Sequence, residues 1–152
     1  MTSVGGRIEV MHGVNLDMLG RRDPAIYGSQ TLAELEAAVG AFAAELGLEV
    51  GFFQTNFEGE FVEHLHGLRG AADGILLNPG AWTHYSWAIH DALEIAGLPA
   101  VEVHLSAVER REEWRRRSVI GDLCVESVSG QGVDGYRTGL ERLLREIDGS
   151  SG

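Results

Sequence analysis

Apolar positions along the chain fall into short continuous runs that alternate with longer segments in which they recur every three to four residues. Short runs bounded by turn residues are typical of strands, and the longer periodic segments are typical of amphipathic helices. Strands are predicted at residues 8–11, 48–55, 74–78, 100–105 and 123–128. Helices are predicted at residues 31–46, 58–68, 82–96, 108–117 and 133–147.

Two of these segments are especially informative about the fold. Thr31 and Glu34 have the spacing of a capping box, which predicts a helix start, and Gly47 ends that helix. Residues 74–78 are apolar without alternation, as in a strand that is buried on both faces of a parallel sheet. Five strands alternating with helices therefore predict a three-layer α/β protein, with a five-stranded parallel sheet and helices on both faces.

Composition narrows the class of protein. The 152 residues, 44% hydrophobic and 23% charged, suit one domain with one core. A net charge of -11 disfavours nucleic acid and anionic membranes as partners. The single cysteine, Cys124, excludes a disulfide within the chain and a cysteine-based zinc site. We find neither a signal-peptide pattern nor an apolar run approaching the ~18 residues of a membrane span, so we expect a cytoplasmic protein.

Polar side chains follow almost every predicted strand. Asn15, Asn56, Asn78, His104 and Ser106 stand at or just beyond strand ends, where ligands bind in parallel sheets. Arginines cluster at residues 21–22 and 110–117. Each cluster is either a solvated surface or part of a pocket for a small anion.

Three patterns suggest other kinds of site. Residues 130–135 read GxGxxG, but no further strand with a terminal acid follows, so glycines at a helix start are favoured over a dinucleotide site. His64 and His66 stand two apart on a helix and point to different sides, so they cannot chelate one ion well. Glu102 and His104 share one face of a strand, where the carboxylate either joins a metal site or orients the histidine. No further ligand pair completes a coordination set, so no metal is expected.

The segment from Asn78 to Asp91 allows two interpretations. Asn78 and His84 together suit sugar-like hydroxyls, or else they belong to a turn and a helix that Thr83 caps. Asp91 points elsewhere, toward a neighbouring subunit or toward solvent. Ser106 and nearby backbone amides are suited to a carboxylate, with Arg115 reaching over from the next helix.

Five segments carry a resemblance to a known family. They read HGVNLDMLGRRDPAIYG, TNFEGE, NPGAWTHYSWAIHDAL, EVHLS and RREEWRRRS, in this order and spacing. Over about residues 7–147, the expected ordered core, the chain resembles type II 3-dehydroquinate dehydratase. The resemblance implies a flavodoxin-like fold, a dodecamer built from trimers, and dehydration of 3-dehydroquinate to 3-dehydroshikimate through an enolate. It implies neither metal nor cofactor, and the route is shikimate biosynthesis or quinate breakdown.

The resemblance also implies a role for individual residues. Tyr27 corresponds to the base and Arg22 to the arginine that activates it, both on a lid loop of about residues 20–29. Asn15 corresponds to the residue that holds a water against the enolate oxygen, and His104 to the general acid, with Glu102 beside it. The other implied roles are hydroxyl binding by Asn78, His84 and Arg115, carboxylate binding by Leu105 and Ser106, and a contribution across the trimer interface by Asp91.

Several positions depart from the family pattern. His12 and Val14 stand in a segment that usually reads Asn-Gly-Pro-Asn, Ala107 follows Ser106 in place of asparagine, and Phe57 and Trp82 are bulkier than expected. We expect His12, Phe57 and Trp82 to reshape the pocket. Two alternatives therefore stay open: a related enzyme acting on another cyclic polyol acid, and a flavodoxin-like binding domain without catalysis.

Overall fold

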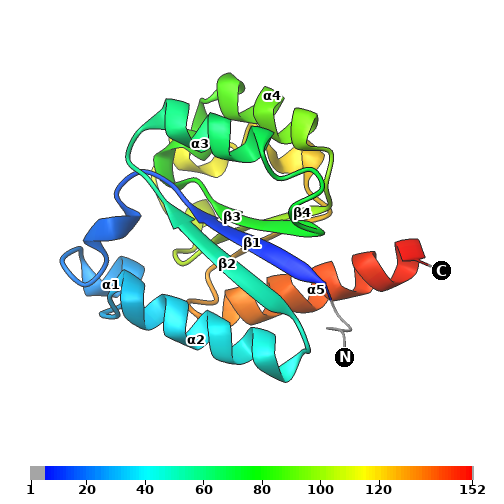
Figure 1. Ribbon diagram of the computed structural model, residues 1–152. Coiled ribbons are helices and arrows are strands. Elements are labelled where there is room, and N and C mark those ends of the chain that lie inside the picture. Colours follow the sequence, from blue (N-terminus) through cyan, green and yellow to red (C-terminus); the bar gives the residue numbers. More distant parts are fainter. Residues whose placement is uncertain (1–5, 152) are drawn as a thin grey trace.

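The computed structural model, which describes residues 6–151, is built on one parallel sheet (Figure 1). Its strands are β1 (Arg7–His12), β2 (Glu49–Gln54), β3 (Gly74–Asn78), β4 (Ala100–His104) and β5 (Glu126–Ser129). They lie in the order β2-β1-β3-β4-β5, and every adjacent pair is parallel. The predicted five-stranded parallel sheet is confirmed.

Helices cover both faces of this sheet. The α-helices are α1 (Pro24–Tyr27), α2 (Leu32–Glu45), α3 (Glu58–His66), α4 (Trp87–Ala96) and α5 (Asp134–Ser151). Figure 1 shows α2 and α5 on one face and α3 and α4 on the other. Each face has its own apolar core, with Val10 and Leu76 packed on the α2–α5 side and Met11 and Leu77 packed on the α3–α4 side. The flavodoxin-like, three-layer architecture is confirmed.

The start of α2 follows the predicted capping box. The Thr31 hydroxyl accepts from the Glu34 backbone N–H at 3.1 Å, and the Glu34 carboxylate accepts from the Thr31 N–H at 2.9 Å. Two backbone donors at the helix start are thereby satisfied. Leu35 and Val39 then bury the inner face of α2 against the sheet.

The predicted helix over residues 82–96 is wrong in one respect, because two helices occupy this segment. A 3-10 helix, Gly80–His84, comes first, and α4 then begins after Ser86, whose hydroxyl accepts from the Ile89 N–H at 3.1 Å. His84 therefore ends the first helix and does not lie in the first turn of the second. The Thr83 hydroxyl caps no helix and donates to the Glu102 carboxylate.

Two further boundaries differ from the prediction. Residues 108–117 form two separate 3-10 helices, Val108–Arg110 and Glu113–Arg116, in place of one short helix. The last strand begins at Glu126, because its pairing with β4 begins there, and the 3-10 helix Gly121–Leu123 occupies the start of the predicted run. Within residues 6–151, no helix has both the length and the apolar character needed to span a bilayer.

The polarity of the strand connections reverses between β1 and β3. The chain leaves β1 toward β2 on one side, and β3 continues toward β4 and β5 on the other, which opens a crevice at the strand ends. The two exits approach closely because of glycine: a Cβ on Gly13 would lie 2.2 Å from the Pro79 carbonyl oxygen. Gly80, at φ +69°, would place a Cβ 2.6 Å from the Val14 carbonyl oxygen. Val14 and Gly80 also line the pocket at this crevice.

Candidate active site

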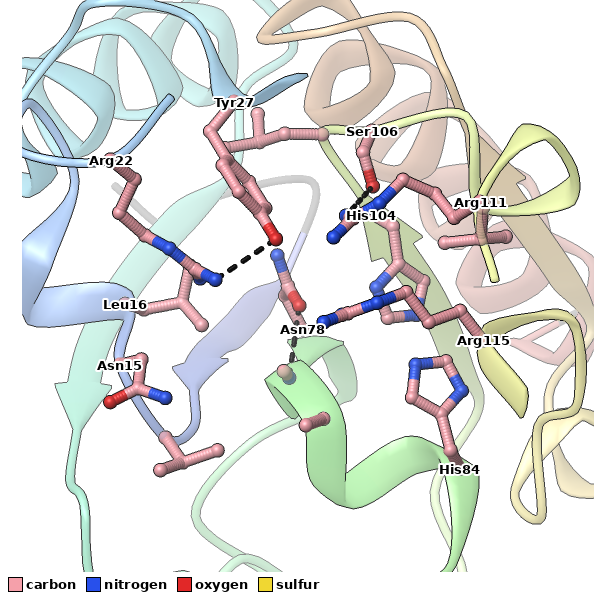
Figure 2. A pocket seen from close by; sticks show the side chains of 15 residues that line it. Asn15, Leu16, Arg22, Tyr27, Asn78, His84, His104, Ser106, Arg111 and Arg115 are labelled. Carbon is pink, nitrogen blue, oxygen red and sulfur yellow. Dashed lines mark hydrogen bonds between the residues drawn. The ribbon is translucent and has the colours of Figure 1, made fainter. Parts of the chain in front are cut away.

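A pocket lies at this crevice, where β1, β3 and β4 end (Figure 2). Nine of the eleven site residues predicted from the sequence line it, whereas Glu102 lies behind His104 and Asp91 lies on the outer surface of α4. The complete lining is Val14, Asn15, Leu16, Arg22, Tyr27, Asn78, Gly80, Ala81, His84, His104, Leu105, Ser106, Val108, Arg111 and Arg115.

One tight turn brings Arg22 and Tyr27 together. The Asp23 carboxylate accepts from the Ala25 N–H at 3.0 Å and caps α1, Pro24 occupies its first position, and Gly28 ends it. The Arg22 Nη2 atom then donates to the Tyr27 hydroxyl at 2.9 Å, and its guanidinium carbon lies 3.9 Å from the ring centroid. The guanidinium of Arg22 therefore contacts both the oxygen and the ring of Tyr27.

The two adjacent arginines differ in their surroundings, and a third arginine joins the pocket. Arg21 is exposed, whereas Arg22 is half-buried against Tyr27. Arg111 lies with its guanidinium carbon 5.2 Å from the Tyr27 ring centroid, and it donates to the Ser106 hydroxyl at 3.4 Å. Sequence alone does not identify Arg111, because nothing local in the cluster at residues 110–117 distinguishes the arginines that face the pocket.

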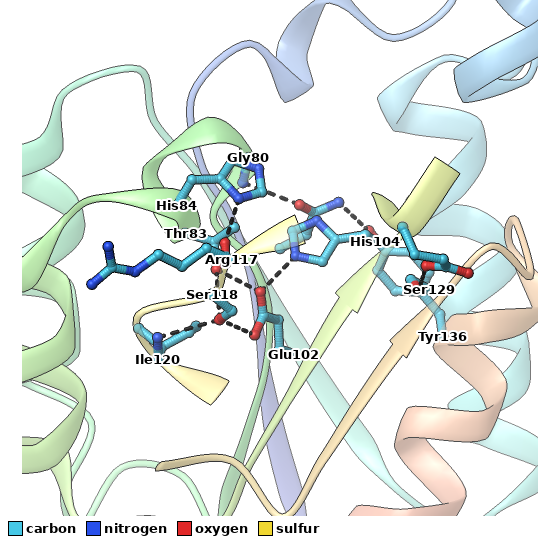
Figure 3. A network of polar contacts seen from close by, with 12 residues as sticks. Gly80, Thr83, His84, Glu102, His104, Arg117, Ser118, Ile120, Ser129 and Tyr136 are labelled. Carbon is cyan, nitrogen blue, oxygen red and sulfur yellow. Dashed lines mark hydrogen bonds and ion pairs between the residues drawn. The ribbon is translucent and has the colours of Figure 1, made fainter. Parts of the chain in front are cut away.

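On the opposite side of the pocket, His104 is held by a buried carboxylate (Figure 3). The His104 Nε2 atom lies 2.6 Å from Glu102 Oε2, and Ser118 and Thr83 donate their hydroxyls to the same carboxylate. Burial alone would raise the pKa of Glu102, but the hydrogen bond from His104 and those from the two hydroxyls outweigh it and lower the pKa. The ionised carboxylate fixes the His104 proton on Nε2, so an imidazolium would have its second N–H at Nδ1.

Asn78 and His84 present complementary groups. The Asn78 Oδ1 atom accepts from the Gly80 N–H at 3.1 Å, which leaves Nδ2 as a donor. The His84 Nδ1 atom lies 2.6 Å from the Arg117 carbonyl and must donate to it, so Nε2 of the neutral ring is an acceptor. Burial lowers the pKa of His84, which favours this neutral form. A donor and an acceptor on one pocket wall suit a ligand with several hydroxyl groups.

Asn15 has a left-handed backbone conformation, with φ 70°. Its N–H donates to the Asn56 Oδ1 atom at 2.8 Å, and the Asn56 amide donates to Asp17 at 3.1 Å. Such a conformation costs about 1 kcal/mol or more in a non-glycine residue and persists only where surrounding contacts hold it. Asn56, which the sequence interpretation placed at a strand end without a role, supplies such a contact across the β1 and β2 exits.

Phe57 and Trp82 stand outside the pocket, and their predicted effect on its shape is wrong. The Phe57 side chain is exposed, and Trp82 packs edge-on against Phe61 in the α3–α4 core, with ring centroids 5.6 Å apart. Val14 does line the pocket, and His12 is buried beneath it.

The alternative sites suggested by the sequence find no structural support. Among the residues that the structure describes, no three His, Cys, Asp or Glu side chains are grouped closely enough to hold a metal ion. His64 contacts Glu9 at 2.6 Å and stacks on Phe53, away from the pocket. Gly130 and Gly132 have positive φ angles just before α5, as expected of glycines at a helix start.

Comparisons with known proteins show the family to which this fold and sequence belong. The family model described as dehydroquinase class II matches residues 6–144. A 3-dehydroquinate dehydratase from Carboxydothermus hydrogenoformans is 48% identical over 151 residues, covering 96% of this chain and 98% of that protein. The crystal structure of a type II dehydroquinase from Propionibacterium acnes has a TM-score of 0.88 and 37% identity, covering 95% of this chain and 98% of the other. One from Butyrivibrio crossotus has a TM-score of 0.87 and 37% identity, covering 90% and 96%. The chain belongs to the class II dehydroquinase family.

Proposed function

We propose that this protein is a hydro-lyase that converts 3-dehydroquinate to 3-dehydroshikimate by trans elimination through an enolate. The observation that carries the proposal is a base with its cation, Tyr27 and Arg22, in the same pocket as an acid with its carboxylate, His104 and Glu102. Removal of a proton next to a ketone and loss of a neighbouring hydroxyl require this pairing of groups.

The first step is proton removal by Tyr27. As the phenolate, with Arg22 beside it, Tyr27 takes a proton from the carbon next to the ketone, and the electron pair moves onto the ketone oxygen. Asn15 holds a water against the resulting enolate oxygen. Hydrogen bonding to the atom on which charge develops stabilises the transition state.

The second step expels water. The electron pair returns from the enolate and forms the carbon–carbon double bond while the carbon–oxygen bond breaks, and His104 donates the Nδ1 proton to the departing hydroxyl. Afterwards Tyr27 carries one extra proton and His104 lacks one. A proton must therefore pass from the phenol to the imidazole, directly or through solvent, before the next turnover.

Other residues of the pocket bind the hydroxyl groups and the carboxylate of the substrate. Asn78, His84 and Arg115 contact its hydroxyls, and the backbone amides of Leu105 and Ser106 with the Ser106 hydroxyl hold its carboxylate. Arg22, Arg111 and Arg115 concentrate positive charge in the pocket of a protein whose net charge is -11. This charge distribution favours an anionic substrate at this position.

Residues 20–29 act as a lid over the pocket. Gly20 and Gly28, at φ +91° and +79°, lie near the two ends of this segment, and the Arg22–Tyr27 pair lies between them. Closure of the segment would exclude water and strengthen the effect of Arg22 on Tyr27. The base, the acid and the groups that hold them are all side chains, so we propose that the reaction proceeds without metal or cofactor.

The protein acts as a homo-oligomer, a dodecamer built from trimers, in the cytoplasm. Trp87 and Asp91 are one turn apart on α4 and are both exposed, and Tyr85 beside them is 60% exposed. Large exposed aromatic side chains that lie together are typical of a surface that a partner covers. In the assembly, Asp91 would contribute to the pocket of a neighbouring subunit.

An ultraviolet assay of the conjugated product tests the function. We expect the absorbance of the enone to rise when the enzyme meets 3-dehydroquinate, and to rise at the same rate in the presence of a chelator. No rise at high enzyme concentration would exclude this function and favour another cyclic polyol acid as substrate, or binding without catalysis. Loss of the rise with chelator would exclude the metal-free route alone.

A further inference from the structure

Beneath the pocket, three buried side chains form a line of hydrogen bonds that begins at Asn78. Its Nδ2 atom lies 3.5 Å from the Tyr136 hydroxyl, which lies 2.9 Å from His12 Nε2. Tyr136 comes from α5, whereas His12 and Asn78 are register partners at the ends of β1 and β3. His12 and Tyr136 are fully buried and Asn78 is 4% exposed, so the line is closed to solvent except at the pocket.

The proton positions along this line follow from its two ends. The Gly80 N–H donates to Asn78 Oδ1, so the amide must present Nδ2 to Tyr136. The Tyr136 oxygen accepts this bond, and we assign its own hydrogen to an unprotonated His12 Nε2, because with Nε2 protonated the phenol hydrogen would have no acceptor among the described residues. Burial lowers the pKa of His12 to about 4 and raises the pKa of Tyr136, so both groups are neutral at neutral pH. The line therefore has one direction, from Asn78 through Tyr136 to His12.

A buried histidine at position 12 is unfavourable for stability, which suggests that its side chain has a role. The His12 Nδ1 atom, which carries the remaining proton, is buried without a hydrogen-bond partner among the described residues. An unsatisfied buried donor is unfavourable, and an apolar side chain of similar volume would avoid it. What His12 supplies in return is an acceptor at Nε2 that sets the direction of the Tyr136 hydroxyl.

We propose that His12 and Tyr136 are positioning residues that orient the Asn78 amide, so that its second Nδ2 hydrogen points into the pocket toward a substrate hydroxyl. The inference rests on the proposed role of Asn78 in binding substrate. The Gly80 N–H alone fixes one atom of the amide and leaves the plane free to rotate. The Tyr136 hydroxyl fixes the second atom, and with it the donor that the ligand meets.

A double-mutant cycle tests this coupling. Tyr136→Phe removes the hydroxyl and keeps the ring, and we expect kcat/KM for 3-dehydroquinate to fall about 2- to 10-fold, mainly through KM. In the Asn78→Ala background, the same substitution should have no further effect. An equal loss in both backgrounds, or no loss in the wild-type background, would overturn the proposal, because Tyr136 would then act independently of Asn78.

Two further variants separate positioning from stability. Leu140→Ala, one turn along α5 and equally buried, should lower the melting temperature without changing KM. His12→Leu removes the acceptor and should raise KM, whereas His12→Gln offers a replacement acceptor and should recover part of the loss. The His12 pair decides the matter if Tyr136→Phe does not fold: equal KM values in both variants would contradict the proposal.

A measurement without turnover keeps the inference separate from the function. In a ¹H–¹⁵N spectrum, the side-chain amide signals of Asn78 can be identified by their loss in Asn78→Ala. We expect Tyr136→Phe to shift both of these signals and to leave those of exposed Asn56 in place. Unshifted Asn78 signals would overturn the positioning role, whereas a wild-type protein inactive on 3-dehydroquinate would overturn only the proposed function.

Discussion

Arg21 and Arg22 offer a matched pair for testing how the base is activated. The two side chains are adjacent and carry the same charge, but Arg21 is exposed and Arg22 donates to the Tyr27 hydroxyl at 2.9 Å. A hydrogen bond that involves a charged group contributes about 1.5–3 kcal/mol. If this energy stabilises the phenolate that removes the proton, Arg22→Ala should lower kcat/KM about 10- to 150-fold. Arg21→Ala should change it by less than about 2-fold, as expected of an exposed charge.

The assay is steady-state product absorbance, measured for both variants over a range of pH and salt. Arg22→Lys keeps the charge but loses the planar fork, so it should recover only part of the rate. The pH profile of Arg21→Ala should match that of the wild type, whereas that of Arg22→Ala should differ, because only Arg22 contacts the Tyr27 hydroxyl. Added salt screens an exposed charge more strongly than the half-buried Arg22–Tyr27 contact.

Equal losses in the two variants would refute this reasoning. They would indicate that both arginines merely attract the anionic substrate. In that case the loss of kcat/KM would become smaller in both variants as salt is added. A loss below about 2-fold in Arg22→Ala would refute it as well, because the contact with Tyr27 would then contribute nothing to the transition state. The outcome depends on which of two neighbouring cations touches the phenol, and overall charge is the same in both variants.

Three further predictions concern the base, the buried carboxylate and the assembly. Tyr27→Phe should lower kcat by at least about 100-fold with little change in melting temperature, and near-full turnover would exclude Tyr27 as the base. The pKa of Glu102 is lowered in the folded protein, so its stabilisation is complete above the unfolded value of about 4.3 and is lost as pH falls through the folded value. Urea titrations from pH 3 to 7 should therefore show that the free energy of unfolding falls less steeply toward acid pH in Glu102→Gln than in the wild type. An identical fall in both proteins would contradict the network. Light scattering should give the mass of a dodecamer, in which Asp91→Ala lowers activity; a fully active monomer would refute the cross-subunit role.

The sheet and its layers could be predicted because short stretches rich in apolar residues, such as GILLN at residues 74–78, alternate with segments that have a helical period. The split of residues 82–96 was not predicted, for a reason visible in the packing. Trp82 and Ile89 both contact the α3–α4 core, so the apolar period continues across the break between the two helices. The spacing of apolar residues indicates which side chains face the sheet. It does not indicate whether the backbone between them forms one helix. Ser86, a good capping residue within the segment, is the local sign of the break.

The arginines around Tyr27 show why only part of the site could be predicted. Arg22 reaches Tyr27, five positions further along the chain, through a turn whose Asp-Pro start and glycine end are visible in the sequence. Arg111 arrives from a segment more than 80 residues away, and its orientation depends on Ser106 and on Glu112, which pairs with it at 3.5 Å. Side chains in two short 3-10 helices have no regular face, so no period separates the inward-facing arginines from the exposed ones. Local sequence shows the turn but does not distinguish Arg22 from Arg21, so the contact with Tyr27 was predicted from the family resemblance alone. The contact of Arg111 depends on where two distant strands end and requires the assembled sheet.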